Sequence, residues 1–189
     1  IAYNSIMELV NNRAIVVDVI NPVISYVVND LSVKRIGIIG TKATINSGTY
    51  LKKITGLNDE IKVASLPTPL LVPMIEEGFI FDDISNAIIR SYLSKSELKD
   101  IDALILGCTH YPIIKNQINK FYNFKVEVVD SSRIVATYVR DLLHEKSLLK
   151  ENTGADNKFF ISDYTDYFKE ISRLFFEEEI KIGKLNFWS

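Results

Sequence analysis

The chain contains few residues of the kinds that staple small proteins or bind metals. Its 189 residues include one cysteine, two histidines and five prolines. A single cysteine excludes an internal disulfide framework, and with only two histidines we expect no metal site. No apolar run approaches the roughly 20 residues needed to cross a bilayer, so we expect no association with a membrane.

The chain also has no large excess of positive or negative charge. The chain has 22 Lys and Arg residues against 24 Asp and Glu residues, a formal net charge of -2, and its basic residues are scattered. This distribution gives no electrostatic footprint for nucleic acid. The opening residues carry no basic region ahead of an apolar one, so the sequence indicates no signal peptide and favours a cytoplasmic protein. The chain does not begin with methionine, which favours a fragment of a longer chain.

Apolar runs alternate with amphipathic stretches along the chain, which is typical of an α/β protein with a mainly parallel sheet and flanking helices. The expected strands are residues 13–20, 34–40, 61–66, 103–106, 125–129, 159–161 and 181–188. The expected helices are residues 5–11, 22–29, 49–54, 70–78, 82–92, 112–121, 133–146 and 164–176. The aromatic-rich stretch 159–188 is expected in the core, as is the stripe Ile134, Thr137, Tyr138 and Leu142, whereas His144 is expected at the surface.

The only cysteine, Cys108, follows the buried strand predicted at 103–106 and precedes a helix that begins at Pro112. In open α/β sheets, this carboxyl end of a strand is where ligands bind. A neighbouring imidazole, here His110, and a helix N-terminus both favour the thiolate. Such a cysteine could be an acyl-transfer nucleophile or a proton-transfer base, or it could simply fill space in the core.

Two further stretches carry polar groups at expected helix ends. Residues 40–48 form a Gly- and Thr-rich turn between a strand and a helix, which can present N–H groups and hydroxyls to an anion or can be a plain connection. Glu76 and Glu77 stand at a helix C-terminus ahead of Gly78, against the helix dipole. Either one of these acids has a function or both are a solvated helix end.

Several stretches together resemble the glutamate racemases. Residues 107–112 (GCTHYP) resemble the second-cysteine motif of that family, which is a specific one. Family-like stretches also occur, in the family's order, at 19–22 (VINP), 40–50 (GTKATINSGTY), 72–78 (VPMIEEG) and 129–131 (VDS). The resemblance covers essentially the whole chain.

The resemblance implies cofactor-independent interconversion of L- and D-glutamate for peptidoglycan synthesis. It implies two α/β domains related by a pseudo-twofold axis, with the substrate between them and one cysteine from each. One thiolate removes the α-proton, and the opposite thiol delivers a proton to the other face. On this sequence Cys108 is the second catalytic cysteine, His110 assists proton transfer and contacts the substrate, and Glu76 interacts with His110 or the substrate ammonium. Thr109 contacts the substrate, and no cofactor is implied.

The first-cysteine motif of the family departs from the pattern. The family reads ACNT where this chain reads AYNS, so Tyr3 stands in place of the cysteine, with Asn4 and Ser5 as substrate-binding residues. The resemblance implies that Thr41 and Thr44 give hydroxyls to the substrate carboxylate. A phenol is a poor substitute for a thiol in proton transfer, since its unperturbed pKa is roughly 10 against about 8.5.

The family's N-terminal motifs also have no counterpart here. We therefore expect residues 1–21 to be a remnant of the first racemase domain, 22–130 to be the second domain, and 131–189 to complete the first. Little or no racemase activity is expected of this chain, and exposed apolar surface is expected to favour a homodimer. The alternatives are a non-catalytic binding or regulatory module derived from a racemase, or an aspartate racemase.

Overall fold

Four parallel strands form the central sheet of the computed structural model, which describes residues 2–11, 13–80, 82–150, 158–162, 172, 176 and 180–185. The sheet has the order β2-β1-β3-β4. The strands are β1 (Arg35–Gly40), β2 (Lys62–Pro67), β3 (Ala103–Leu106) and β4 (Glu127–Val129). The predicted α/β class with a parallel sheet is confirmed.

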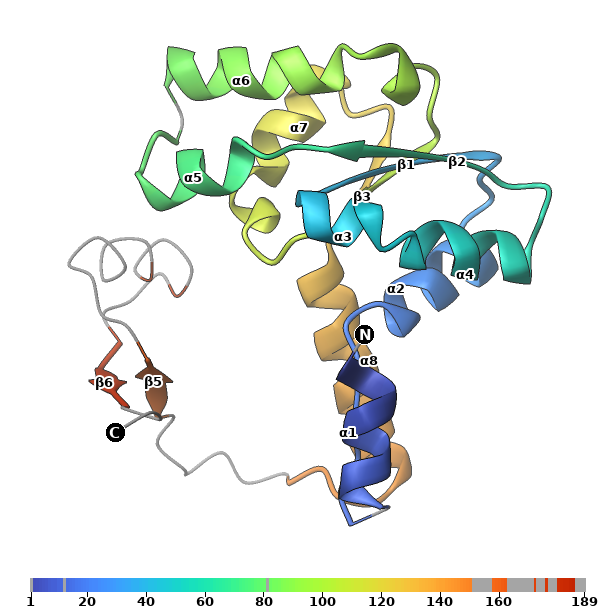
Figure 1. Ribbon diagram of the computed structural model, residues 1–189, viewed down its shortest axis with the longest axis vertical. Helices are drawn as coiled ribbons and strands as arrows, with labels where there is room; N and C mark the ends of the chain where they lie inside the picture. The colour runs from blue at the N-terminus through green and yellow to red at the C-terminus, as the bar shows by residue number, and fades with distance from the viewer. Residues whose placement is uncertain are drawn as a thin grey trace.

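Helices cover both faces of this sheet (Figure 1). One face carries α5 (Leu71–Glu76), α6 (Asp83–Leu93) and α7 (Lys115–Phe121), and the other carries α2 (Asn21–Ser25), α4 (Thr49–Leu57) and α8 (Ser131–Glu145). The remaining helical segments are α1 (Ala2–Val10), the π-helix η1 (Tyr26–Asp30), α3 (Lys42–Asn46), and the 3₁₀ turns η2 (Ser96–Leu98) and η3 (Tyr111–Ile114). None of the helices in the described part of the chain has the length and apolar character needed to cross a membrane.

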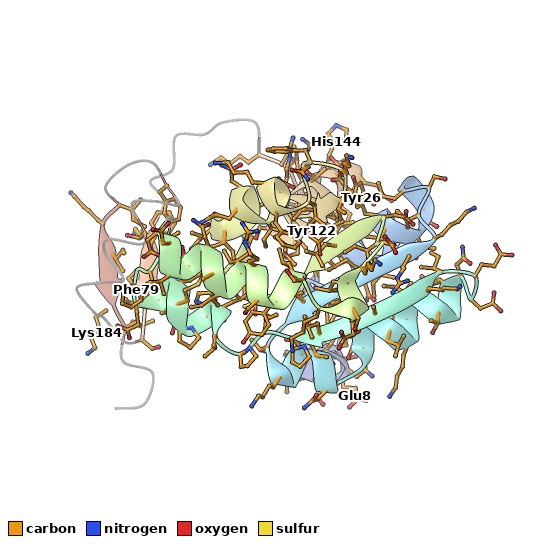
Figure 2. The ribbon with its side chains drawn as sticks, turned by 90° about the horizontal axis from the view of Figure 1, so that it is seen from above. Glu8, Tyr26, Phe79, Tyr122, His144 and Lys184 are labelled. Atoms are coloured by element: carbon orange, nitrogen blue, oxygen red, sulfur yellow. The ribbon has the colours of Figure 1, made fainter. Side chains whose placement is uncertain are left out.

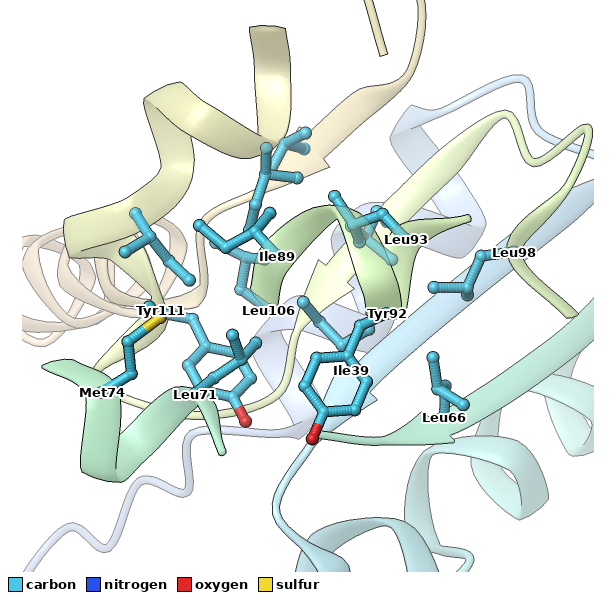
Figure 3. Close-up of a cluster of buried hydrophobic side chains, with 14 of the residues drawn as sticks. Ile39, Leu66, Leu71, Met74, Ile89, Tyr92, Leu93, Leu98, Leu106 and Tyr111 are labelled. Carbon is cyan, nitrogen blue, oxygen red and sulfur yellow. The ribbon is translucent and has the colours of Figure 1, made fainter. Parts of the chain in front are cut away.

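Strand β3 divides the core into two halves. It pairs with β1 on one side and β4 on the other, and all four of its residues are buried. Because side chains alternate along a strand, Leu104 and Leu106 pack under α5, α6 and α7, whereas Ala103 and Ile105 pack under α2 and α4. Figure 3 shows Leu106 among the side chains of the first half. The predicted central strand at 103–106 is confirmed.

Two short strands make a separate parallel sheet. β5 (Phe159–Ile161) pairs with β6 (Ile182–Lys184), as expected for strands near 159–161 and 181–188. The prediction that this aromatic-rich stretch is core is wrong for Phe160 and Phe176, whose side chains are 57% and 44% exposed. The reason is that β5 hydrogen-bonds to β6 and not to the four-stranded sheet. The predicted helix 164–176 lies outside the described residues, except for residues 172 and 176.

The strand predicted at 13–20 is wrong. Residues 13–20 form bends and irregular chain and belong to none of the described strands. Asp18 explains the difference, because its carboxylate Oδ1 accepts hydrogen bonds from the N–H groups of Ile20 and Asn21 at 2.8 and 2.7 Å. These bonds turn the chain into α2, and a side chain that satisfies local backbone groups competes with sheet formation.

Three further predictions about helices can be compared with the structure. Residues 42–46 form the helix α3 where a turn was predicted, with Thr41 as its N-cap. The predicted core stripe of α8 is wrong for Thr137 and Tyr138, which are exposed, because α8 packs on the core through Ile134 and Val135. His144 is exposed at the periphery of the molecule, as predicted (Figure 2).

Leu104 of β3 is the residue by which the two-sided core can be tested. Its side chain is fully buried, so Leu104→Ala should lower the free energy of unfolding by about 3 kcal/mol. Ile84→Ala is the control, because Ile84 is 58% exposed and its loss should change that free energy by less than about 0.5 kcal/mol. Urea unfolding followed by circular dichroism measures both, and equal losses in the two variants would contradict this packing.

Candidate active site at the carboxyl edge of the sheet

Three polar segments meet at one edge of the sheet because the strands are parallel. Thr41 follows β1, Thr68 follows β2, and Cys108 lies two residues after β3. The carboxyl ends of parallel strands lie at the same edge, which is the edge where α/β proteins bind ligands. The fold therefore brings together, on one side of the molecule, the three stretches in which site residues were predicted: 40–48, 72–78 and 107–112.

Gly107 allows the cysteine-bearing turn to lie close to β1. Its N–H donates to the carbonyl oxygen of Ile39 at 2.8 Å. A Cβ at this position would lie 2.9 Å from the same oxygen, a separation that side chains do not adopt. Glycine is thus required where the chain leaves β3, directly before Cys108.

Cys108, His110 and Glu76 are connected by two successive side-chain contacts. Cys108 Sγ lies 3.7 Å from His110 Nδ1, and His110 Nε2 lies 3.1 Å from Glu76 Oε1. Neutral histidine has one N–H donor and one acceptor nitrogen. If Nε2–H donates to the carboxylate, the bare Nδ1 faces the thiol and can accept its proton. The predicted contact between Glu76 and His110 is present in the structure.

The Cys108 side chain is half-buried, and this sets its protonation. Burial raises the pKa of the thiol above its ordinary value, and the negative charge of Glu76 raises it further. Backbone hydrogen bonds from His110 and Thr109 act in the opposite direction, but the pKa remains raised. At neutral pH Cys108 is therefore a protonated thiol that needs a base to become nucleophilic or basic.

Thr41 and Thr44 lie side by side at the start of α3. Their hydroxyl oxygens are 3.0 Å apart, and Thr41 Oγ1 accepts the N–H of Thr44 at 3.2 Å. The Thr44 methyl group approaches Gly107, since a Cβ there would lie 3.5 Å from it. The predicted pair of hydroxyls is thus brought together next to the Cys108 turn, although on a short helix and not on a loop.

A cavity of about 280 Å³ opens beside Cys108. Its described walls come from the Cys108 turn, from α4, from the start of α8 and from the segment before α2: Val19, Tyr50, Gly107, Cys108, Thr109, Ser131, Ser132, Val135 and Ala136. Cys108 and Thr109, two of the predicted site residues, line this cavity. His110, Glu76 and the Thr41–Thr44 hydroxyl pair are not among the residues that line this cavity.

Sequence reasoning missed Tyr50 and Ser131 as residues of this cavity. Burial raises the pKa of Tyr50 to about 12, with the Asp18 carboxylate adding to the effect, so its phenol stays neutral at physiological pH. Ser131 is buried and its hydroxyl donates to the carbonyl oxygen of Leu106 at 3.3 Å. Both residues stand in stretches that resemble the racemases, 40–50 and 129–131, and this was the signal available in the sequence.

A buried pair of hydroxyl groups connects the Cys108 turn to the segment that follows β2. Thr68 Oγ1 and the Tyr111 hydroxyl lie 2.7 Å apart, and both residues are fully buried. Thr68 Oγ1 also donates to the carbonyl oxygen of Gly40 at 3.2 Å. Figure 3 shows the hydroxyls of Tyr111 and Tyr92 on the same side of the cluster; the Tyr92 hydroxyl accepts the N–H of Leu70 at 3.3 Å.

Tyr3, Asn4 and Ser5 lie on α1, and the structure does not bring them to Cys108. Asn4 and Ser5 are exposed, and none of the three is among the residues described as lining the cavity. Their predicted contact with substrate therefore stays a prediction. Within the described ranges, no three His, Cys, Asp or Glu side chains are grouped so that they could hold a metal ion.

Comparison with known proteins assigns the chain to a family. Residues 16–139 match the Asp/Glu/Hydantoin racemase family. The chain belongs to this family. It is 39% identical over 170 residues to a glutamate racemase of Persephonella marina, and 38% identical over 147 residues to one of Chlorobaculum parvum. The matches cover 90% and 77% of this chain but only 63% and 54% of those relatives, so this racemase-family chain spans less than two thirds of their length.

Solved structures of racemases share the fold. A glutamate racemase from Francisella tularensis, in complex with D-glutamate, superposes with a TM-score of 0.84 and 36% identity, over 96% of this chain and 67% of that one. A glutamate racemase isoform from Bacillus anthracis gives a TM-score of 0.86 with 27% identity, over 98% of this chain and 70% of that one. The superpositions show that this chain has the fold of the part of these racemases that it covers.

The protonation of Cys108 can be measured directly because it is the only cysteine. We expect the rate of its alkylation by iodoacetamide to rise with pH around a midpoint above that of free cysteine. Glu76→Gln removes a negative charge that raises the thiol pKa, so it should move the midpoint to lower pH. The neighbouring Glu77→Gln is the matched control and should leave the midpoint unchanged. A shift to higher pH in Glu76→Gln would show that Glu76 acts instead through the charge of His110.

Proposed function

We propose that this chain carries one half of a glutamate racemase site, in which Cys108 exchanges a proton with Cα of glutamate. The observation that carries the proposal is the line from Cys108 through His110 to Glu76 at the carboxyl edge of the sheet. The names of the relatives support it, as does the D-glutamate bound by the Francisella tularensis protein. The D-glutamate would serve peptidoglycan synthesis in the cytoplasm.

The proposed proton path starts from the neutral thiol. His110 Nδ1 accepts the proton of Cys108, and Glu76 stabilises the imidazolium that forms. The thiolate then removes the α-proton from one face of the substrate, or the thiol delivers a proton to that face in the reverse direction. The α-proton is very weakly acidic, so the carboxylate must be held by fixed donors; Thr41, Thr44 and Thr109 supply hydroxyls for this. None of these steps requires a cofactor.

Inversion at Cα requires a second acid or base on the opposite face, because a single group returns the proton to the face it left. The position that matches the family's first cysteine is Tyr3, next to the proposed substrate-binding residues Asn4 and Ser5. We propose that residues 22–130 form one racemase domain, and that 1–21 and 131–189 belong to the other. A second copy of the chain in a homodimer is a further proposed partner.

A specific observation favours a second function, that of a binding or regulatory module. Tyr3 lies on the surface helix α1 and not among the described walls of the Cys108 cavity. A chain with one working half-site could hold glutamate without inverting it. The two functions differ in whether the α-proton of glutamate exchanges with solvent.

Proton exchange therefore tests the proposal. In deuterated water, we expect the chain to exchange the α-proton of one glutamate enantiomer without producing the other. Cys108→Ala should reduce this exchange to background, and His110→Gln should slow it by about a hundredfold or more, as removal of a general base does. His144→Gln is the control for the histidine change, because His144 is an exposed residue of α8.

Three outcomes would contradict parts of the proposal. Exchange that persists in Cys108→Ala would remove Cys108 from the chemistry. Binding of glutamate without exchange by the unaltered chain would favour the binding module. Rapid racemisation by the 189-residue chain would show that a second acid or base is already present, against the expectation from Tyr3.

A further inference from the structure

A polar groove lies between helices α6 and α7, away from the Cys108 turn. Its volume is about 470 Å³, and it is lined by Asp83, Asn86, Ile89 and Arg90 of α6 and by Gln117, Lys120 and Phe121 of α7. We refer to it as the α6–α7 groove. None of these residues also lines the described walls of the Cys108 cavity, so the groove is a separate feature.

The groove has an acidic end and a basic end. α6 joins β2 to β3 and α7 joins β3 to β4, so both helices run opposite to the parallel strands and therefore run in the same direction. Asp83 is the first residue of α6, and Arg90 lies seven positions later, about 10 Å along the axis. Lys120 is in the last turn of α7, at the same end as Arg90.

The charged groups of the groove have no ionic partner within the described residues. No ion pair of that part of the chain includes Asp83, Arg90 or Lys120, and all three side chains are exposed. They are thus available to a ligand that carries a positive group at one end and a negative group at the other.

The side-chain amide of Gln117 can pair with a ligand that offers both a hydrogen-bond donor and an acceptor. Its Nε2 and Oε1 atoms are both buried, and neither has a hydrogen-bond partner in the described structure. A buried amide left unpaired is destabilising and rare in folded proteins. A peptide group carries one N–H and one C=O, so it complements a carboxamide at both positions. Gln117 lines the groove, so rotation of its side chain would bring the buried amide to such a ligand.

We propose that the α6–α7 groove binds a short zwitterionic peptide of about three residues. Its ammonium group lies at Asp83, its carboxylate at Arg90 and Lys120, and one of its peptide groups pairs with Gln117. An extended residue spans about 3.3–3.6 Å, so three residues match the rise of about 10 Å along α6 from Asp83 to Arg90. Ile89 and Phe121 provide apolar surface under the peptide side chains. The binding is independent of whether the chain acts on glutamate.

Calorimetric titration with three matched probes tests the proposal. The probes are tri-L-alanine, its N-acetyl form and its C-terminal amide. Tri-L-alanine should bind saturably, and each capped form should bind about five-fold more weakly, the ratio expected for the loss of one exposed ion pair. Asp83→Asn should abolish the difference between the free and the acetylated peptide, and Lys120→Gln should reduce the difference between the free peptide and the amide. Asp59→Asn and Lys62→Gln, exposed positions outside the groove, are the charge-matched controls.

Gln117→Leu separates binding from folding. It should weaken tri-L-alanine binding by about five-fold or more, while the melting temperature stays the same or rises because an unpaired buried amide is removed. A fall in the melting temperature would mean that Gln117 stabilises the fold and is not held for a ligand. Absence of saturable tri-L-alanine binding, or equal affinity for the free and capped forms, would overturn the proposal.

Discussion

The hydrogen bond between Thr68 and Tyr111 joins the segments that carry the candidate site. The two hydroxyls are fully buried and 2.7 Å apart, and Thr68 also bonds to Gly40, the residue before Thr41. Tyr111 follows the Cys108 turn directly, and α5, which ends at Glu76, begins three residues after Thr68. A hydroxyl left without a partner in this core would cost about 1–3 kcal/mol. The pairing therefore favours the one arrangement in which all three segments meet at the sheet edge.

The cavity beside Cys108 has few described lining residues that could take part in acid-base chemistry. Of the residues described as lining the cavity, only Cys108 and Tyr50 are ionisable, and the pKa of Tyr50 is raised to about 12. The phenol of Tyr50 therefore stays neutral near neutral pH, which leaves Cys108 as the proposed acid-base group; its Sγ lies 3.7 Å from His110 Nδ1, and His110 in turn contacts Glu76. Helix α8 contributes the apolar residues Val135 and Ala136 to the cavity wall, together with Ser131 and Ser132. The presence of this single group among the described lining residues is the basis for proposing a half-site.

The sequence was sufficient for those features that depend on local pattern. The apolar run at 103–106 gave the central strand, and Gly107 and Pro112 gave the turn that holds Cys108. It was insufficient where a long-range or competing contact decides. Asp18 binds backbone N–H groups and prevents a strand at 13–20, while Tyr50 reaches the cavity only because α4 packs beside Gly107. The exposed face of α8 was mispredicted because helical periodicity alone does not tell which elements are present to cover it.

The most direct test of this account is the alkylation of Cys108 after the Thr68–Tyr111 bond is removed. The account predicts that Thr68→Val and Tyr111→Phe each loosen the turn, reduce the burial of the thiol and move its midpoint toward that of free cysteine. The double variant should shift no further than either single one, because both act through one bond. Tyr138→Phe, an exposed tyrosine, should have no effect. An unchanged pH profile in both single variants, with lower stability, would contradict the claim that this bond positions Cys108.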